Sequence, residues 1–146
     1  MRKGMVGAVL ISVLAIVGCG GDSSLSQAEY EQQLELVCNK GIQERAELVS
    51  EVTREFEEQR ERKSSPQYEA ENVGKLATVY EGTTDELDEL GLPEQEPEKV
   101  EAMIRAREEA SARVLADPLA ARGQLEPIFE DANKLAESLG VKSCTM

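Results

Sequence analysis

From Ser26 onward, apolar residues recur at steps of three and four, the spacing of one face of an amphipathic helix. The first segment with this spacing is expected to run from Ser26 to about Lys63. Its apolar-face positions are Tyr30, Leu34, Val37, Cys38, Gly41, Leu48, Val52 and Phe56. Ser26 and Glu29 have the spacing of a capping box at the helix start. Ser64-Ser65-Pro66 ends the segment, because proline disfavours helix in the residue before it.

Three more helical segments follow the first. The second carries the apolar positions Val73, Leu76, Ala77, Tyr80, Leu87 and Leu90. In this segment Thr83 and Thr84 stand where another core residue is expected, and Gly91 is the expected C-cap. The third segment begins at Glu96-Pro97, where proline is tolerated in the first turn. Its apolar positions are Val100, Met103, Ile104, Ala110, Val114 and Leu115.

Asp117-Pro118 breaks or kinks the third segment, and the fourth segment follows with the cleanest pattern. Its apolar positions are Leu125, Ile128, Phe129, Ala132, Leu135, Ala136 and Leu139, and Gly140 caps it. The chain has no strand-like alternation and no long internal repeat. Four amphipathic helices with short connections predict an all-α domain over residues 27–146, folded as an antiparallel four-helix bundle.

The far part of the first helix, residues 51–63, is mostly charged. At 1.5 Å per residue the first helix would reach about 55 Å, longer than its neighbours. One interpretation is a solvated helix end with salt bridges between its own charges. The other is a protruding helical arm that meets a partner, with Phe56 as an apolar contact.

Residues 1–18 have the pattern of a cleaved secretory signal peptide. Arg2 and Lys3 give a positive start, and residues 4–17 are apolar except for Ser12. The apolar run of about 14 residues is shorter than the roughly 20 that a membrane-spanning helix needs. The expected cut falls between Gly18 and Cys19. A plain secretory signal with an incidental cysteine is the alternative.

Ile16-Val17-Gly18-Cys19 resembles a bacterial lipobox, which has an aliphatic residue first, then a tolerant position, then Gly or Ala, then Cys. The resemblance implies that the Cys19 thiol takes a diacylglyceryl group and becomes the mature N-terminus. Two or three acyl chains would hold the protein in the membrane almost permanently, whereas one chain anchors only marginally. Residues 19–26 would then be a flexible tether, and the domain would lie on the extracytoplasmic face of the cell membrane.

The net charge of the chain limits the classes of partner that we expect it to bind. Loss of Arg2 and Lys3 with the signal peptide would take the formal net charge from −13 to −15. The sequence offers no basic patch to meet phosphates, so a nucleic-acid partner is not expected. Strong acidity also keeps the domain soluble and gives it no electrostatic reason to lie on an anionic membrane.

Once Cys19 is assigned to lipid, Cys38 and Cys144 remain as an even pair in an oxidising compartment. We predict a disulfide between them; two free buried thiols are the alternative. In the loop-entropy model, closing about 107 residues stabilises the fold by roughly 4–5 kcal/mol. In an up-down-up-down bundle the fourth helix ends beside the start of the first, which agrees with this pairing.

Catalytic and metal-binding motifs are missing from the sequence. The chain has no histidine, which excludes Ser-His-Asp and Cys-His sites and the Glu-x-x-His motif of di-iron bundles. It has no Walker A sequence, no G-x-G-x-x-G and no C-x-x-C. Asp85, Asp88 and Glu89 could offer oxygen ligands to a divalent cation, but their spacing also describes an ordinary exposed helix face. We therefore expect no cofactor, no metal site and no enzyme activity.

Two looser segments carry a broader resemblance, Leu87-Asp88-Glu89-Leu90-Gly91-Leu92-Pro93 and Leu139-Gly140-Val141-Lys142-Ser143-Cys144. With the early cysteine they make the chain similar to the small lipoproteins common in high-GC Gram-positive bacteria. That group brings no established activity, so nothing catalytic carries over.

The expected function is a non-enzymatic, membrane-anchored binding or protein-interaction module with an extracytoplasmic partner. The alternative is a small-ligand or divalent-cation-binding lipoprotein accessory to a transporter. An unpaired apolar patch on the first or second helix would favour the interaction module. A calcium-dependent shift in melting temperature would favour the cation binder.

Replacing the proposed lipid attachment site tests the anchor. Cys19→Ala should release the protein from membranes, because the acylated thiol is the proposed anchor. Fractionation of cells and the intact mass of the wild-type protein measure this. The wild-type mass should begin at Cys19 and include acyl chains. A Cys19→Ala protein that still sediments with membranes contradicts the prediction.

Overall fold

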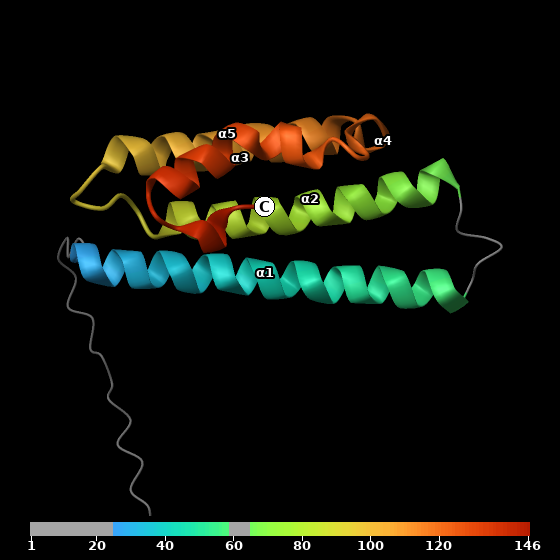
Figure 1. Cartoon of the computed structure of the whole chain (residues 1–146), viewed down its shortest axis with the longest axis horizontal. Coiled ribbons are helices and arrows are strands. Elements are labelled where there is room, and N and C mark those ends of the chain that lie inside the picture. Colours follow the sequence, from blue (N-terminus) through green and yellow to red (C-terminus); the bar gives the residue numbers. More distant parts are fainter. Residues whose placement is uncertain (1–24, 59–64) are drawn as a thin grey trace, which may run out of the picture.

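The computed structural model describes residues 25–58 and 65–146, and every regular element in them is helical (Figure 1). The helices are α1 (Gln27–Glu58), α2 (Pro66–Glu89), α3 (Pro97–Ala116), α4 (Pro118–Ala121) and α5 (Leu125–Ser138), followed by the 3₁₀ turn η1 (Lys142–Cys144). The predicted all-α class is confirmed. The signal peptide, the cleavage site and Cys19 lie outside the described residues, as do residues 59–63 of the predicted first helix.

The predicted capping box at the start of α1 is confirmed, a side-chain cap that was not predicted starts α2, and the predicted start at Glu96-Pro97 has no side-chain cap. The Ser26 N–H and hydroxyl both donate to Glu29 Oε2, at 3.0 and 2.6 Å, and the Glu29 N–H donates to Ser26 Oγ at 3.4 Å. These bonds hold the pKa of Glu29 below its usual value. At the start of α2, Ser65 Oγ accepts from the Tyr68 N–H at 3.2 Å, and Pro66 occupies the first turn.

The predicted helix ends are also in place. Gly91 and Gly140 follow α2 and α5 with φ angles of 73° and 78°, a left-handed conformation that glycine adopts without steric cost. Asp117-Pro118 divides the third segment from a short extra helix, α4. The Asp117 carboxylate caps α4 by accepting from the Ala120 N–H at 3.0 Å. The break predicted at this point is therefore a complete one.

Consecutive long helices run in opposite directions along the molecule, and α2 lies between α1 on one side and the α3–α5 layer on the other (Figure 1). Helix α2 packs against α1, α3 and α4, and α3 packs against α5. Helix α1 packs mainly against α2 and η1. It has 32 residues and α5 has 14, so α5 matches less than half of its length. A closed antiparallel four-helix bundle therefore stays a prediction.

The core has two parts. The first joins all four long helices and the C-terminal turn through Tyr30, Leu34, Cys38, Leu87, Val100, Met103, Ile104, Ala136, Val141 and Cys144. The second joins α2 to α5 through Ala77, Tyr80, Ala110, Val114, Ala121 and Phe129. Helix α1 contributes to the first part only. Its buried residues end at Gly41, and beyond that point it is covered on one side by α2.

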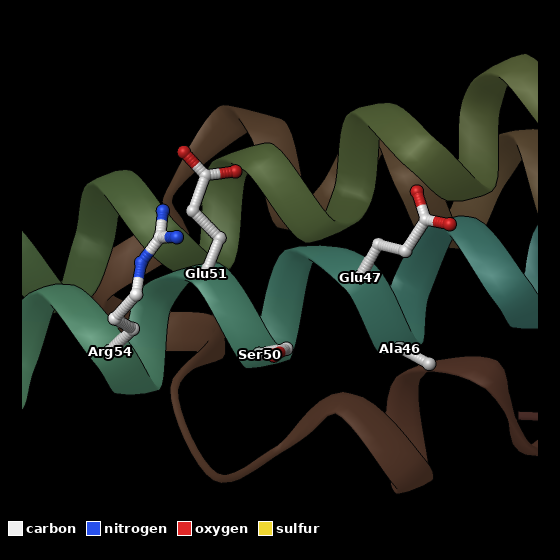
Figure 2. Close-up of a pocket in the computed structure, with 5 residues that line it drawn as sticks. All are labelled: Ala46, Glu47, Ser50, Glu51 and Arg54. Carbon is white, nitrogen blue, oxygen red and sulfur yellow. The ribbon is translucent and has the colours of Figure 1, made fainter.

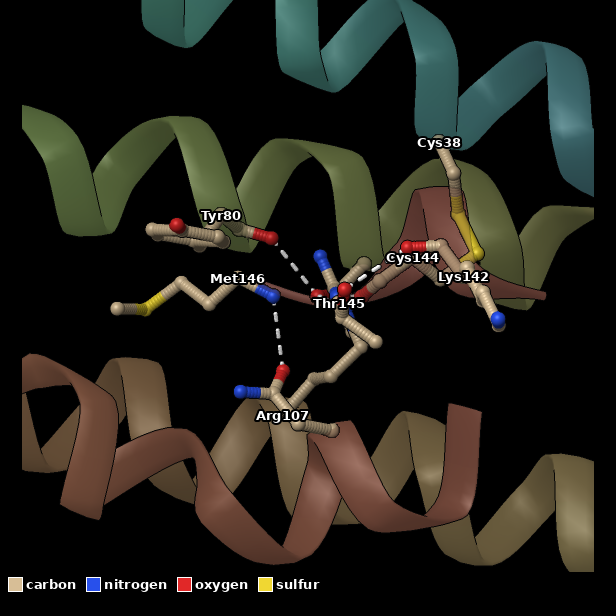
Figure 3. The surroundings of a disulfide bond; sticks show 9 residues. Cys38, Tyr80, Arg107, Lys142, Cys144, Thr145 and Met146 are labelled. Atoms are coloured by element: carbon tan, nitrogen blue, oxygen red, sulfur yellow. Dashed lines mark hydrogen bonds between the residues drawn. A yellow bond between two sulfur atoms is a disulfide. The ribbon is translucent and has the colours of Figure 1, made fainter. Parts of the chain in front are cut away.

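The predicted disulfide joins Cys38 of α1 to Cys144 of η1 (Figure 3). Both cysteines are buried, and 106 positions separate them in the sequence. The bond ties the early part of α1 to the last residues of the chain. It therefore fastens α1 to the layer that α5 and η1 occupy.

Helices α1 and α2 approach closely where Gly41 faces Thr83. A Cβ atom on Gly41 would lie 2.5 Å from Thr83 Oγ1 and 2.9 Å from Thr83 Cγ2. Thr83 is itself fixed, because its hydroxyl donates to the Val79 carbonyl at 2.8 Å. The close crossing of α1 and α2 therefore depends on glycine at position 41, which has no side chain.

Two glycine substitutions test this close approach. Gly41→Ala should lower the free energy of unfolding by about 1 kcal/mol or more, because overpacking outweighs the gain in helix propensity. Gly82→Ala is the matched control, since a Cβ there meets nothing within 4 Å. It should raise the free energy of unfolding by up to about 1 kcal/mol. Chemical denaturation measures both. Equal effects of the two substitutions would contradict the packing.

Candidate interaction surface

One face of α1 is apolar and exposed. Ile42, Val49 and Phe56 are each separated by seven residues and so lie on the same side of the helix. Their exposed fractions are 39%, 56% and 40%. Ala46 and Thr53 lie between them on that side and are exposed as well. We call these five residues the α1 strip. It contains no charged side chain, although 12 of the 32 residues of α1 are charged.

The α1 strip is open because α1 packs mainly against two described elements, α2 and η1. Near its start, α1 meets the α5 side of the molecule through the Cys38–Cys144 bond. Farther along, α2 is the described element that packs against α1, and the α1–α2 pair extends past α4 (Figure 1). The far end of α1 is not a free arm, because the Tyr68 hydroxyl of α2 donates to the Val52 carbonyl at 3.5 Å.

A groove of about 440 Å³ lies at the far end of the α1 strip. Its lining comes from α1, α2 and the residue that follows α4, namely Val52, Thr53, Phe56, Tyr68, Glu69, Asn72, Val73 and Arg122. Thr53 and Phe56 belong to both the strip and the groove, so the two form one continuous surface. The volume falls within the range of ordinary ligand pockets.

Two polar features lie in this groove. Arg122 forms an ion pair with the Glu69 carboxylate, which neutralises the guanidinium. The Oδ1 atom of Asn72 is buried and has no hydrogen-bond partner among the described residues. A buried acceptor without a donor costs free energy. The groove therefore combines apolar walls with a neutralised ion pair and with a polar atom that is closed off from solvent.

A second hollow, of about 430 Å³, lies on the outer face of α1 (Figure 2). Its described lining is Ala46, Glu47, Ser50, Glu51 and Arg54, all from one helix. Figure 2 shows Glu47, Glu51 and Arg54 extending from α1, whereas Ala46 and Ser50 leave its surface low. With no second described element as a wall, this hollow is an open surface. Its two glutamates, Glu47 and Glu51, point away from the side of α1 that carries Ala46 and the α1 strip (Figure 2).

A small cavity of about 120 Å³ lies at the opposite end, where α1 begins. It is lined by Gln27, Tyr30, Glu31, Leu34, Pro93, Gln95, Glu96, Val100, Leu139 and Val141. The Tyr30 hydroxyl is buried and has no hydrogen-bond partner within residues 25–58 and 65–146, and burial raises its pKa to about 12. Glu96 has a φ of 52°, a left-handed conformation that is strained for a residue other than glycine.

A buried arginine, Arg107, was missed by the sequence reasoning. It is 2% exposed, and it donates from Nε to Thr84 Oγ1 at 3.1 Å and from Nη1 to the Cys144 carbonyl at 2.7 Å. Figure 3 shows it beside the C-terminal segment that carries the disulfide. Burial and, after it, the nearby charge of Arg45 lower its pKa to about 10. The sequence did contain a signal for its burial, because Arg107 follows Ile104 and precedes Ala110 by three residues on the apolar face of α3.

The acidic cluster on α2 lies on the surface. Asp85, Asp88 and Glu89 are exposed, while Glu86 forms an ion pair with Lys40 of α1. Within residues 25–58 and 65–146, no group of three or more His, Cys, Asp and Glu side chains is arranged to hold a metal ion. None of the helices in the same residues is long and apolar enough to cross a membrane.

Comparison of the chain with protein-family models, with curated proteins and with solved structures finds no match. No relative therefore supplies a site or an activity. The features of the described residues that bear on function are the α1 strip and the groove at its end.

The Tyr30 hydroxyl gives a testable prediction. Tyr30→Phe should raise the free energy of unfolding by about 1 kcal/mol at neutral pH, because it removes a buried hydroxyl that has no partner. The difference should widen as pH rises from about 10 to 12. The folded state retains the phenol proton in that range and the unfolded state loses it, so only the wild type loses stability through this group. Denaturation at several pH values measures this. A destabilised Tyr30→Phe protein would mean that the hydroxyl has a bound partner.

Proposed function

We propose that this chain is a lipid-anchored extracytoplasmic lipoprotein that acts as a non-enzymatic protein-interaction module. In this proposal its domain is an antiparallel four-helix bundle that is open along the far half of α1. The observation that carries the proposal is the α1 strip. Ile42, Val49 and Phe56 expose apolar surface in a row, and contiguous exposed apolar surface is typical of interaction sites.

The placement of the strip along α1 supports this function. An anchor at Cys19 would leave only residues 20–26 before α1 begins. Counted from Gln27, Ile42 and Phe56 lie about 22 and 44 Å along the helix axis. The strip would then be carried away from the membrane by a rigid helix. The disulfide and Arg107 both strengthen the end nearer the anchor.

A second candidate function is a small-ligand-binding lipoprotein accessory to a transporter. The cavity around Tyr30 favours it, because an unpartnered hydroxyl and a strained Glu96 backbone both border it. Its volume of about 120 Å³ is well below the several hundred Å³ of ordinary ligand pockets. Such a ligand would have only a few heavy atoms.

Site-specific crosslinking in native membranes tests the interaction module. A photoreactive amino acid in place of Val49 should give a defined adduct with another extracytoplasmic protein. The same amino acid in place of Leu36 is the matched control, because Leu36 is 55% exposed on the same helix but lies outside the strip. Identical adduct patterns at the two positions, or none at position 49, would count against the proposal.

A further inference from the structure

We propose that the disulfide between Cys38 and Cys144 is a redox-sensitive latch, whose reduction releases the segment after α5 from α1 and opens one end of the domain. We call this segment, residues 140–146, the strap. It contains the turn η1. The proposal goes beyond the interaction function and does not depend on it. It combines three observations, namely the position of the strap, the bonds that hold it and the polar groups buried beside it.

The strap fills the space between α1 and the layer of α3 and α5. Its residues Val141 and Cys144 are buried. They belong to the first core part, as do Tyr30 and Leu34 of α1. Figure 3 shows the strap crossing between α1 and the helix that carries Arg107. Apart from α2, α1 packs mainly against η1. Without the strap, the start of α1 would therefore keep α2 as its main neighbour.

The disulfide is the bond that joins the strap to α1. Within the described residues, no hydrogen bond or ion pair links these two segments, and the hydrogen bonds of the strap go to other helices. Arg107 of α3 donates to the Cys144 carbonyl at 2.7 Å, and the Met146 N–H donates to Asn133 Oδ1 of α5 at 2.9 Å. Reduction of the disulfide therefore leaves only side-chain packing between the strap and α1.

Two polar groups beside the strap would regain water if it moved. The Arg107 guanidinium is buried, and it donates to a hydroxyl and a backbone carbonyl but to no carboxylate within the described residues. The Tyr30 hydroxyl is buried without a partner there, in a residue that lines the same small cavity as Val141 of the strap. Burial of such groups opposes closure. The covalent bond thus holds closed a place where packing alone is weak.

The opening stays local, because the rest of the domain does not use the strap. The second core part joins α2 to α5 and contains no residue of α1 or of the strap. Helix α1 also stays beside α2 through the close approach of Gly41 to Thr83 and through the ion pair between Lys40 and Glu86. Reduction therefore opens the end that carries the disulfide and leaves the other end folded.

The reductant in this proposal is a dithiol. One of its thiolates attacks Cys144 Sγ, forms a mixed disulfide and expels Cys38 as a thiolate. Its second thiolate then attacks the mixed disulfide and releases Cys144. Two electrons and two protons pass to the two cysteines, and the dithiol becomes a disulfide. Cys144 is the sulfur that a local opening exposes first, because it lies in a turn of three residues beside exposed Lys142, whereas Cys38 lies inside a helix of 32 residues.

Reduction without denaturant tests the latch. The full-length oxidised protein is incubated with dithiothreitol, a small dithiol, and the thiols formed at Cys38 and Cys144 are identified by alkylation and peptide mass. Amide hydrogen exchange then compares the oxidised and reduced protein. Exchange should become at least about tenfold faster in residues 27–41 and 140–146 and stay within about twofold in residues 110–132, because only the first two segments open. Reoxidation should restore the original pattern.

Two variants locate the effect. Cys38→Ser lacks the latch, so the same two segments should exchange fast without dithiothreitol and should not respond to it. Ser143→Ala is the matched control, because it changes the residue beside Cys144 and keeps the disulfide. It should respond to dithiothreitol like the wild type. If Cys38→Ser does not fold, the reversible reduction of the wild type still decides the outcome.

Three results overturn the proposal. Thiols that form only in denaturant would make the disulfide a permanent crosslink. Equal acceleration of exchange in residues 110–132 would mean that the bond supports the whole fold. Unchanged exchange after reduction would mean that side-chain packing alone holds the strap against α1.

Discussion

The disulfide between Cys38 and Cys144 is the constraint on which the arrangement of α1 depends. Apart from α2, the element that α1 packs against most is η1, a turn of three residues. Such a turn offers little apolar surface for α1 to pack against. The covalent bond therefore supplies the stabilisation of α1 that a larger packed area would otherwise give. Arg107 of α3 also fixes Cys144, because its guanidinium donates a hydrogen bond to the Cys144 carbonyl.

Arg107 shows how the core tolerates a buried cation without a buried carboxylate. Its guanidinium donates to one hydroxyl and one carbonyl, and its carbon Cζ lies 5.8 Å from the centre of the Tyr80 ring. Arg45 lies over the same ring at 4.6 Å. An aromatic face attracts a cation, and hydrogen bonds compensate part of the lost hydration. The lowered pKa of Arg107 indicates that this compensation is incomplete.

The open surface follows from the small number of elements that pack against α1. Fastened near its start, α1 extends along α2 past the layer that α4 and α5 form (Figure 1). A closed bundle would need a fourth helix as long as α1, and α5 has 14 residues where α1 has 32. Ile42, Val49 and Phe56 are exposed on a side of α1 that no described helix packs against. The open surface is thus a consequence of α1 having α2 and η1 as its main neighbours among the described elements.

The sequence by itself determined the helices, their caps and the cysteine pair. These depend on local signals, such as the Ser26–Glu29 capping box, the Asp117-Pro118 break and the glycines at positions 91 and 140. One of its two interpretations of the far end of the first helix named Phe56 as a partner contact, which stays a prediction, and neither interpretation named Ile42 or Val49, which lie beside the predicted core face. Only the tertiary structure decided that no described element covers them and that Asn72 Oδ1 and the Tyr30 hydroxyl are buried without partners. The physical reason is that spacing specifies one side of a helix, whereas burial depends on how far neighbouring helices extend along it.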